Sequence, residues 1–75
     1  MEGSTLRQRL LDSLLERIQD DTYPSPTMMD YVESSMKTRE QVLEYTEALL
    51  EKIEATRYPS SSMINRVEAL LARVD

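Results

Sequence analysis

The sequence contains no cysteine and no histidine among its 75 residues. The lack of cysteine excludes disulfide bonds and thiolate chemistry, and the lack of both residue types removes the usual ligands of a structural zinc site. No stretch approaches 18 consecutive apolar residues, which argues against a transmembrane helix. The first residues, Met1 to Thr5, have neither the basic start nor the apolar run of a secretory signal. We therefore expect a cytoplasmic protein without a cofactor or a bound metal.

Glycine, proline and aromatic residues are also scarce, with one glycine, three prolines and tyrosine as the only aromatic type. Alternating runs of β-branched residues are missing, so strands are not expected. The chain carries 9 Lys and Arg against 14 Asp and Glu, a formal net charge of -5. Because binding to phosphate backbones needs clustered basic residues, this balance predicts no nucleic-acid partner. We expect no membrane partner either.

The sequence contains an internal repeat. The sequence LLERI at 14–18 recurs as LLEKI at 49–53, and Tyr-Pro-Ser at 23–25 recurs at 58–60, both at an offset of 35 residues. From position 14 to position 36, the residues identical at this offset are Leu14, Leu15, Glu16, Ile18, Tyr23, Pro24, Ser25, Met28, Val32 and Glu33. Such self-similarity predicts a duplicated unit, in which a helix, a Tyr-Pro-Ser turn and a shorter helix follow one another.

Four segments have apolar residues at spacings of three and four, which predicts helices at about 5–21, 26–36, 39–56 and 61–74. The expected core positions, in chain order, are Leu6, Leu10, Leu11, Leu14, Leu15, Ile18, Met28, Met29, Val32, Met36, Val42, Thr46, Leu49, Leu50, Ile53, Met63, Ile64, Val67, Leu70, Leu71 and Val74. The predicted fold is all-α: a compact four-helix domain made of two repeated αα-hairpins. The repeat units would span about 5–37 and 38–75 of a single domain, 1–75.

Two Thr-x-x-Gln sequences indicate where the long helices begin. Thr5 with Gln8, and Thr38 with Gln41, both fit the capping box, in which the Thr side chain accepts from the N3 amide and the Gln side chain reaches back. We expect the long helices to begin at these two threonines.

The Tyr-Pro-Ser sequences indicate where the long helices end and the short ones begin. Pro24 and Pro59 disfavour helical geometry for the tyrosine before them, so the long helices should end shortly upstream. Ser25 and Ser60 are suitable N-caps for the helices that follow, and Pro26 is tolerated at a first helical position.

The sequence offers little catalytic chemistry. Without histidine or cysteine, the remaining options are carboxylate pairs or a Ser–Lys arrangement. Ser34 and Lys37 fit an S-x-x-K pattern, but that pattern means little without its strand-based partners. We interpret Lys37 instead as a complement to the dipole at a helix C-terminus. The sequence therefore predicts a protein that is not an enzyme.

A stripe of five glutamates runs along the predicted helix 39–56. Its members, four and three residues apart in alternation, are Glu40, Glu44, Glu47, Glu51 and Glu54. They lie opposite the expected core positions of the same helix. The stripe can be a solvated face that keeps an acidic protein soluble, which is the interpretation we favour. It can also be an electrostatic docking stripe for a basic protein partner.

The four tyrosines fall into two classes. Tyr23 and Tyr58 occupy equivalent turns, and we expect each ring to pack over its own turn, the alternative being an anchor at an interface. Tyr31 and Tyr45 have no tyrosine at the equivalent repeat position, so the hairpins do not require them. These two are therefore candidate partner-binding residues.

The segment 26–36 is rich in methionine. Met28, Met29 and Met36 can fill an irregular core, which we favour, or can form an adaptable binding surface together with Tyr31. The candidate partner-binding set is Met28, Met29, Tyr31, Met36, Tyr45, Glu40, Glu44, Glu47 and Glu51.

Two functions remain open from the sequence. The first is a small non-enzymatic protein–protein interaction module, a docking or regulatory subunit that associates with itself as a homodimer. The second is an acidic inhibitor, such as an immunity protein or an antitoxin, that neutralises a basic site on its partner. Both follow from the lack of catalytic chemistry, and the second also needs the glutamate stripe to be exposed.

Overall fold

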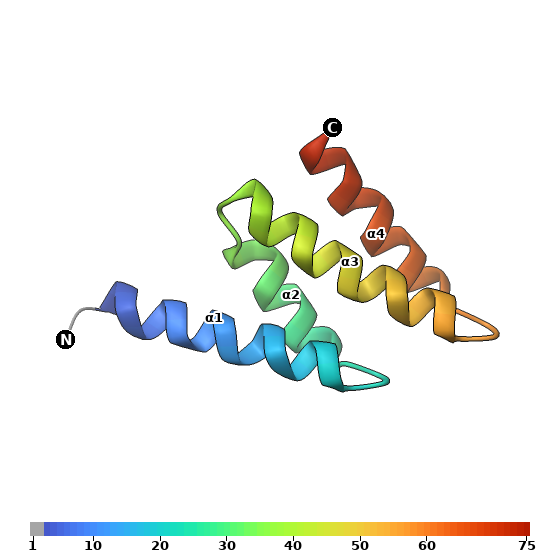
Figure 1. Ribbon diagram of the computed structural model, residues 1–75, viewed down its shortest axis with the longest axis horizontal. Helices are drawn as coiled ribbons and strands as arrows, with labels where there is room; N and C mark the ends of the chain where they lie inside the picture. The colour runs from blue at the N-terminus through green and yellow to red at the C-terminus, as the bar shows by residue number, and fades with distance from the viewer. Residues whose placement is uncertain (1–2) are drawn as a thin grey trace. The chain divides into compact units, whose positions relative to one another are not determined.

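The computed structural model describes residues 3–75, most of which lie in four α-helices (Figure 1). The helices are α1 (Gly3–Asp20), α2 (Pro26–Ser35), α3 (Arg39–Ala55) and α4 (Ser61–Val74). No strand occurs anywhere in 3–75. The predicted all-α class and the four helices are confirmed, and each helix end lies within two residues of its expected position.

The chain divides into two compact units, Met1–Met36 and Lys37–Asp75. The first unit contains α1 packed on α2, and the second contains α3 packed on α4. In each unit a non-helical connection, 21–25 or 56–60, joins the two helices. That the two units form one domain stays a prediction.

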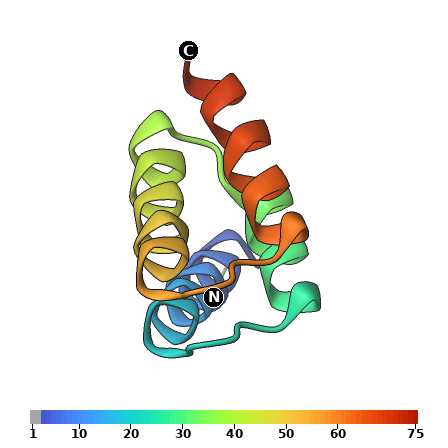
Figure 2. The same ribbon diagram turned by 90° about the vertical axis from the view of Figure 1, so that its right-hand side faces the viewer.

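In the second unit, α3 and α4 lie side by side and run in opposite directions, as Figures 1 and 2 both show. The Arg39 guanidinium on α3 donates a hydrogen bond of 3.4 Å to the carbonyl oxygen of Val74 on α4. This contact joins the beginning of α3 to the end of α4, as an antiparallel pair requires. The buried residues on these two helices are Val42, Tyr45, Thr46, Ala48, Leu49, Val67 and Leu70.

In the first unit, α1 is much longer than its partner helix. It has 18 residues against 10 in α2, or about 27 Å against about 15 Å at a rise of 1.5 Å per residue. Figure 1 shows α2 beside the C-terminal half of α1, with the N-terminal half extending beyond it. The buried residues follow this arrangement, because Leu11 and Ile18 are buried whereas residues 3–10 are all exposed.

The short helices begin as the sequence predicts. The Ser25 hydroxyl accepts a hydrogen bond from the backbone amide of Met28, with Pro26 in the first turn. The Ser60 hydroxyl accepts in the same way from the amide of Met63, at 3.1 Å. Both N-caps are confirmed, and each satisfies a backbone donor that the helix itself leaves unpaired.

Only one of the two expected capping boxes forms. The Thr38 hydroxyl accepts from the amide of Gln41 at 3.1 Å, while the Gln41 side-chain oxygen accepts from the amide of Thr38 at 3.2 Å. The box expected at Thr5 is wrong, because α1 begins upstream at Gly3 and Thr5 therefore lies inside the helix. The Gln8 side chain donates instead to Asp12, one turn further along α1.

The two threonines provide a matched test of the cap. Replacing Thr38 with alanine is expected to lower the free energy of unfolding by about 1 kcal/mol, since it removes the partner of an otherwise unpaired amide. Replacing Thr5 with alanine should have no destabilising effect, because alanine has the higher helix propensity. Urea unfolding followed by circular dichroism measures both. Equal losses in the two variants would contradict the assigned helix starts.

Candidate docking surface

The glutamate stripe of α3 is exposed along its whole length. Glu40, Glu44, Glu47, Glu51 and Glu54 all lie at the surface, on the side of the helix opposite Val42 and Leu49, which are buried. The expected orientation of the stripe is therefore observed. Whether the stripe binds a partner or only faces solvent is a question of function.

The methionine and tyrosine candidates divide by burial. Met28 and Tyr31 are half-buried, whereas Met29, Met36 and Tyr45 are buried. For the two buried methionines, burial agrees with core packing rather than with a binding surface. The Tyr45 side chain, for which a surface contact was expected, is completely inaccessible to solvent. Partner binding by these residues stays a prediction.

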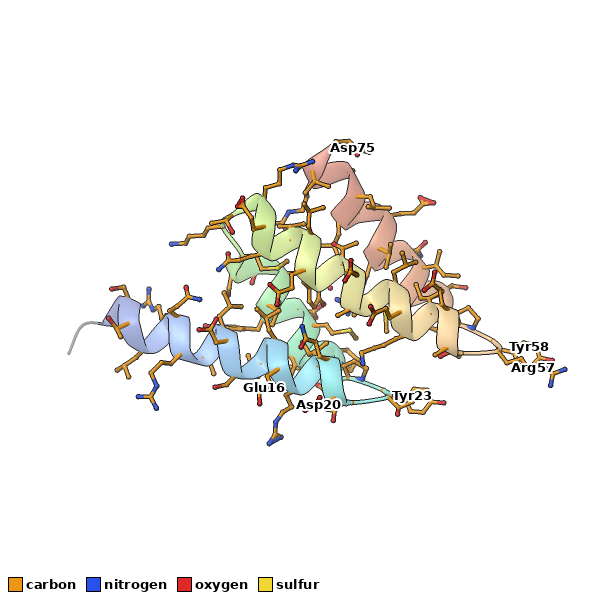
Figure 3. All side chains as sticks on the ribbon, in the orientation of Figure 1. Glu16, Asp20, Tyr23, Arg57, Tyr58 and Asp75 are labelled. Carbon is orange, nitrogen blue, oxygen red and sulfur yellow. The ribbon has the colours of Figure 1, made fainter. Side chains whose placement is uncertain are left out.

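The tyrosines of the two Tyr-Pro-Ser turns do not pack over their turns. Tyr23 and Tyr58 are 84% and 82% exposed, and Figure 3 shows both rings projecting outward from the connections between helices. The preferred expectation for these residues is wrong. Of the prolines that follow them, Pro24 is buried and Pro59 is half-buried. The Arg57 guanidinium lies 5.6 Å from the centre of the Tyr58 ring, within the range of a cation–π contact.

Several positions expected in the core are instead exposed. On α1 they are Leu6 and Leu10, on α3 Leu50, and on α4 Ile64 and Leu71. On α3 and α4 the reason is the width of the apolar arc, which spans 100° or more around a helix, whereas one neighbouring helix covers only a narrower stripe. On α1 the reason is that the shorter α2 does not reach Leu6 and Leu10.

On α3 and α4 these edges form one continuous surface. Leu43 and Leu50 are seven residues apart on α3, and Ile64 and Leu71 are seven apart on α4, so each pair lies on one side of its helix. Both pairs are rotated from the buried stripe by roughly 90°, in the direction of increasing residue number. Because α3 and α4 are both right-handed and run antiparallel, moving by the same angle from the buried stripe of each helix leads to the same side of the hairpin. We call Leu43, Leu50, Ile64 and Leu71 the apolar face.

The apolar face is substantially open to solvent. The exposed fractions of its four side chains lie between 39% and 43%. This surface was not predicted from the sequence, because helical periodicity assigns three of its four residues to the core and Leu43 was not among the expected core positions. The surface could have been predicted from the width of the apolar arcs, because two helices that pack only on each other cannot cover arcs this wide.

Acidic residues border the apolar face on both helices. Glu47 and Glu54 lie next to Leu43 and Leu50 around α3, and Glu68 lies next to Ile64 and Leu71 around α4. All three are exposed. We call Glu47, Glu54 and Glu68 the acidic border. An aliphatic strip between carboxylates suits a ligand that is apolar in the centre and basic at its edges.

Other parts of the described chain offer less. A polar hollow beside the C-terminal half of α1 is lined by Ser13, Glu16, Arg17, Asp20 and Asp21. No group of three or more potential metal ligands occurs within residues 3–75. Nor does that part of the chain contain a helix long and apolar enough to cross a membrane.

Comparison with known proteins gave no match: no family model, no curated protein and no solved structure is significantly similar to the chain.

Proposed function

We propose that the chain is a non-enzymatic protein–protein interaction module, and that the apolar face is its docking surface. The observation that carries the proposal is the exposure of four large aliphatic side chains on one side of the α3–α4 hairpin. Contiguous exposed apolar surface of this kind is typical of interaction sites in small soluble proteins. Its ligand is an amphipathic helix that lays an apolar stripe between α3 and α4.

The acidic border defines the charge of that ligand. Glu47 and Glu54 on one side and Glu68 on the other attract basic residues at the edges of the ligand helix, and they repel acidic ones. Steering by these charges accelerates association, while burial of the aliphatic side chains supplies most of the affinity. The module is therefore selective for helices that have one apolar side with basic residues at the edges of that side.

A designed amphipathic peptide of leucine and lysine is a direct probe of this function. We expect the full chain, diluted until it no longer associates with itself, to bind it in isothermal titration calorimetry. Ile64→Asp/Leu71→Asp should weaken binding by at least about tenfold, because two buried aliphatic contacts are lost. The matched control is Asn65→Asp/Ala72→Asp, which moves each substitution to the next, outward-facing position of α4. Circular dichroism checks that both variants remain helical.

The outcome also separates this function from its alternative, an acidic inhibitor that neutralises a basic partner site. The exposure of all five stripe glutamates favours that alternative. If charge alone holds the peptide, both aspartate variants bind it as tightly as the unmodified chain or more tightly, and added salt abolishes binding. That result would contradict the apolar face as the docking surface. A loss confined to Ile64→Asp/Leu71→Asp supports it.

We also propose that the α3–α4 hairpin and the α1–α2 hairpin are copies of one ancestral unit. The ten identities at an offset of 35 support this, as do the equivalent N-caps Ser25 and Ser60. Replacing residues 61–68 by the sequence of residues 26–33 should then preserve the helix content measured by circular dichroism. A loss of helix would count against the duplication.

A further inference from the structure

A second exposed apolar surface lies at the beginning of α1. Residues 3–10, which we call the α1 segment, are all exposed. Within the segment, Leu6 and Leu10 are 49% and 46% exposed. A spacing of four residues places the two leucines on the same side of the helix. Because α2 is too short to reach this part of α1, the segment has no helix packed on it within its own unit.

The charge of the α1 segment is opposite to that of the apolar face. The segment contains Arg7 and Arg9 and no acidic residue. The two arginines flank the leucine side of the helix, because each lies roughly 60 to 100° from it on opposite sides. The segment is thus an apolar stripe with basic edges, whereas the apolar face is an apolar strip with an acidic border. The chain itself contains both halves of a complementary contact.

We propose that the apolar face of one copy of this chain binds the α1 segment of a second copy. The inference rests on the proposed function and names the ligand helix. Pairing of two apolar faces with each other is disfavoured, because it would bring the acidic borders of both copies together. Docking of the α1 segment places Arg7 and Arg9 beside these carboxylates instead.

The size of the contact indicates a reciprocal dimer. A stable interface buries about 800 Å² on each partner, which is more than one helix segment of eight residues with two leucines provides. In a two-fold dimer each copy inserts its α1 segment into the face of the other, so the same contact forms twice. Each contact brings together six aliphatic side chains, four from the apolar face and two from the α1 segment, so the dimer contains twelve. The homodimer that the sequence predicts thereby receives a definite interface.

A charge exchange between full-length variants tests this pairing. One variant, Arg7→Glu/Arg9→Glu, has an acidic α1 segment and an acidic border. The other, Glu47→Lys/Glu54→Lys, has a basic α1 segment and a largely basic border. Analytical ultracentrifugation should show the unmodified chain to be a dimer, and each variant alone should associate at least about tenfold more weakly. An equimolar mixture of the two should form a dimer again, because both contacts regain opposite charges.

A control variant keeps the change in charge but moves it off the face. Glu44→Lys/Glu51→Lys alters two other glutamates of the same stripe, which point away from Leu43 and Leu50 around α3. This variant should dimerise as the unmodified chain does. If it loses dimerisation as strongly as Glu47→Lys/Glu54→Lys, overall charge rather than the acidic border governs association, and the proposed pairing is wrong.

The remaining outcomes separate this inference from the proposed function. A chain that stays monomeric at high concentration, yet binds the leucine–lysine peptide, overturns the pairing and leaves the docking function intact. A chain that is monomeric and does not bind the peptide overturns both. A dimer that the charge exchange neither weakens nor restores also overturns the pairing, because some other surface then holds the two copies together.

Discussion

Replacing Tyr45 with alanine is expected to lower the free energy of unfolding by about 3–5 kcal/mol, the range for removal of a buried aromatic side chain. Tyr45 on α3 is completely buried, so its truncation leaves a cavity that the surrounding side chains fill only in part. A chain of 75 residues without cysteine, and therefore without disulfides, has a total stability of about 5 kcal/mol or less. The variant should therefore be largely unfolded at room temperature, as measured by circular dichroism and urea titration.

Tyr58 supplies the control for this experiment. Its ring is 82% exposed, so Tyr58→Ala should change the free energy of unfolding by no more than about 0.5 kcal/mol. If Tyr45→Ala is as stable as Tyr58→Ala, the placement of Tyr45 in the core is wrong. Tyr45 would then again be a candidate for the surface contact that its lack of a repeat partner first suggested.

Replacing Leu49 with alanine is expected to lower the free energy of unfolding by about 3 kcal/mol. Leu49 is fully buried, whereas the next residue, Leu50, is 42% exposed. Leu50→Ala removes the same number of atoms from a position that keeps much of its contact with water, and it should cost less than about 1 kcal/mol. Urea unfolding curves of the two variants measure the difference directly.

This pair also tests the orientation on which the docking surface depends. Adjacent residues of a helix differ by about 100° in direction, so Leu49 and Leu50 report which side of α3 faces the core. A larger loss at Leu50 than at Leu49 would mean that α3 is turned on its axis. The apolar face would then be buried, and both the proposed function and the proposed dimer would lose their basis.

Local chemistry explains which parts of the fold were predictable. Ser25, Thr38 and Ser60 each cap the helix that follows, because a side-chain oxygen within three residues satisfies a backbone amide. This interaction needs nothing beyond its own segment. The failure at Thr5 shows where local signals become ambiguous: threonine and glutamine are also acceptable inside a helix, and α1 begins upstream at Gly3.

Tertiary packing decided which apolar residues became surface. Each helix of the sequence has an apolar arc, and periodicity assigns Leu49 and Leu50, or Leu70 and Leu71, to the core with equal weight. Only the position of the neighbouring helix distinguishes them, and it leaves Leu50 and Leu71 exposed. The same holds for Leu6 and Leu10, whose exposure follows from the difference in length between α1 and α2.

The sequence by itself determined the helical class, the four helices and most of their caps, because these depend on contacts within a few residues. It also determined the exposed glutamate stripe, since α3 has one charged side and one apolar side. The tertiary structure decided the burial of Tyr45, the exposure of Tyr23 and Tyr58, and the existence of the apolar face. These features depend on where a second helix lies. Helical periodicity fixes the direction of a side chain around its own helix, but it does not fix which residues that side chain contacts.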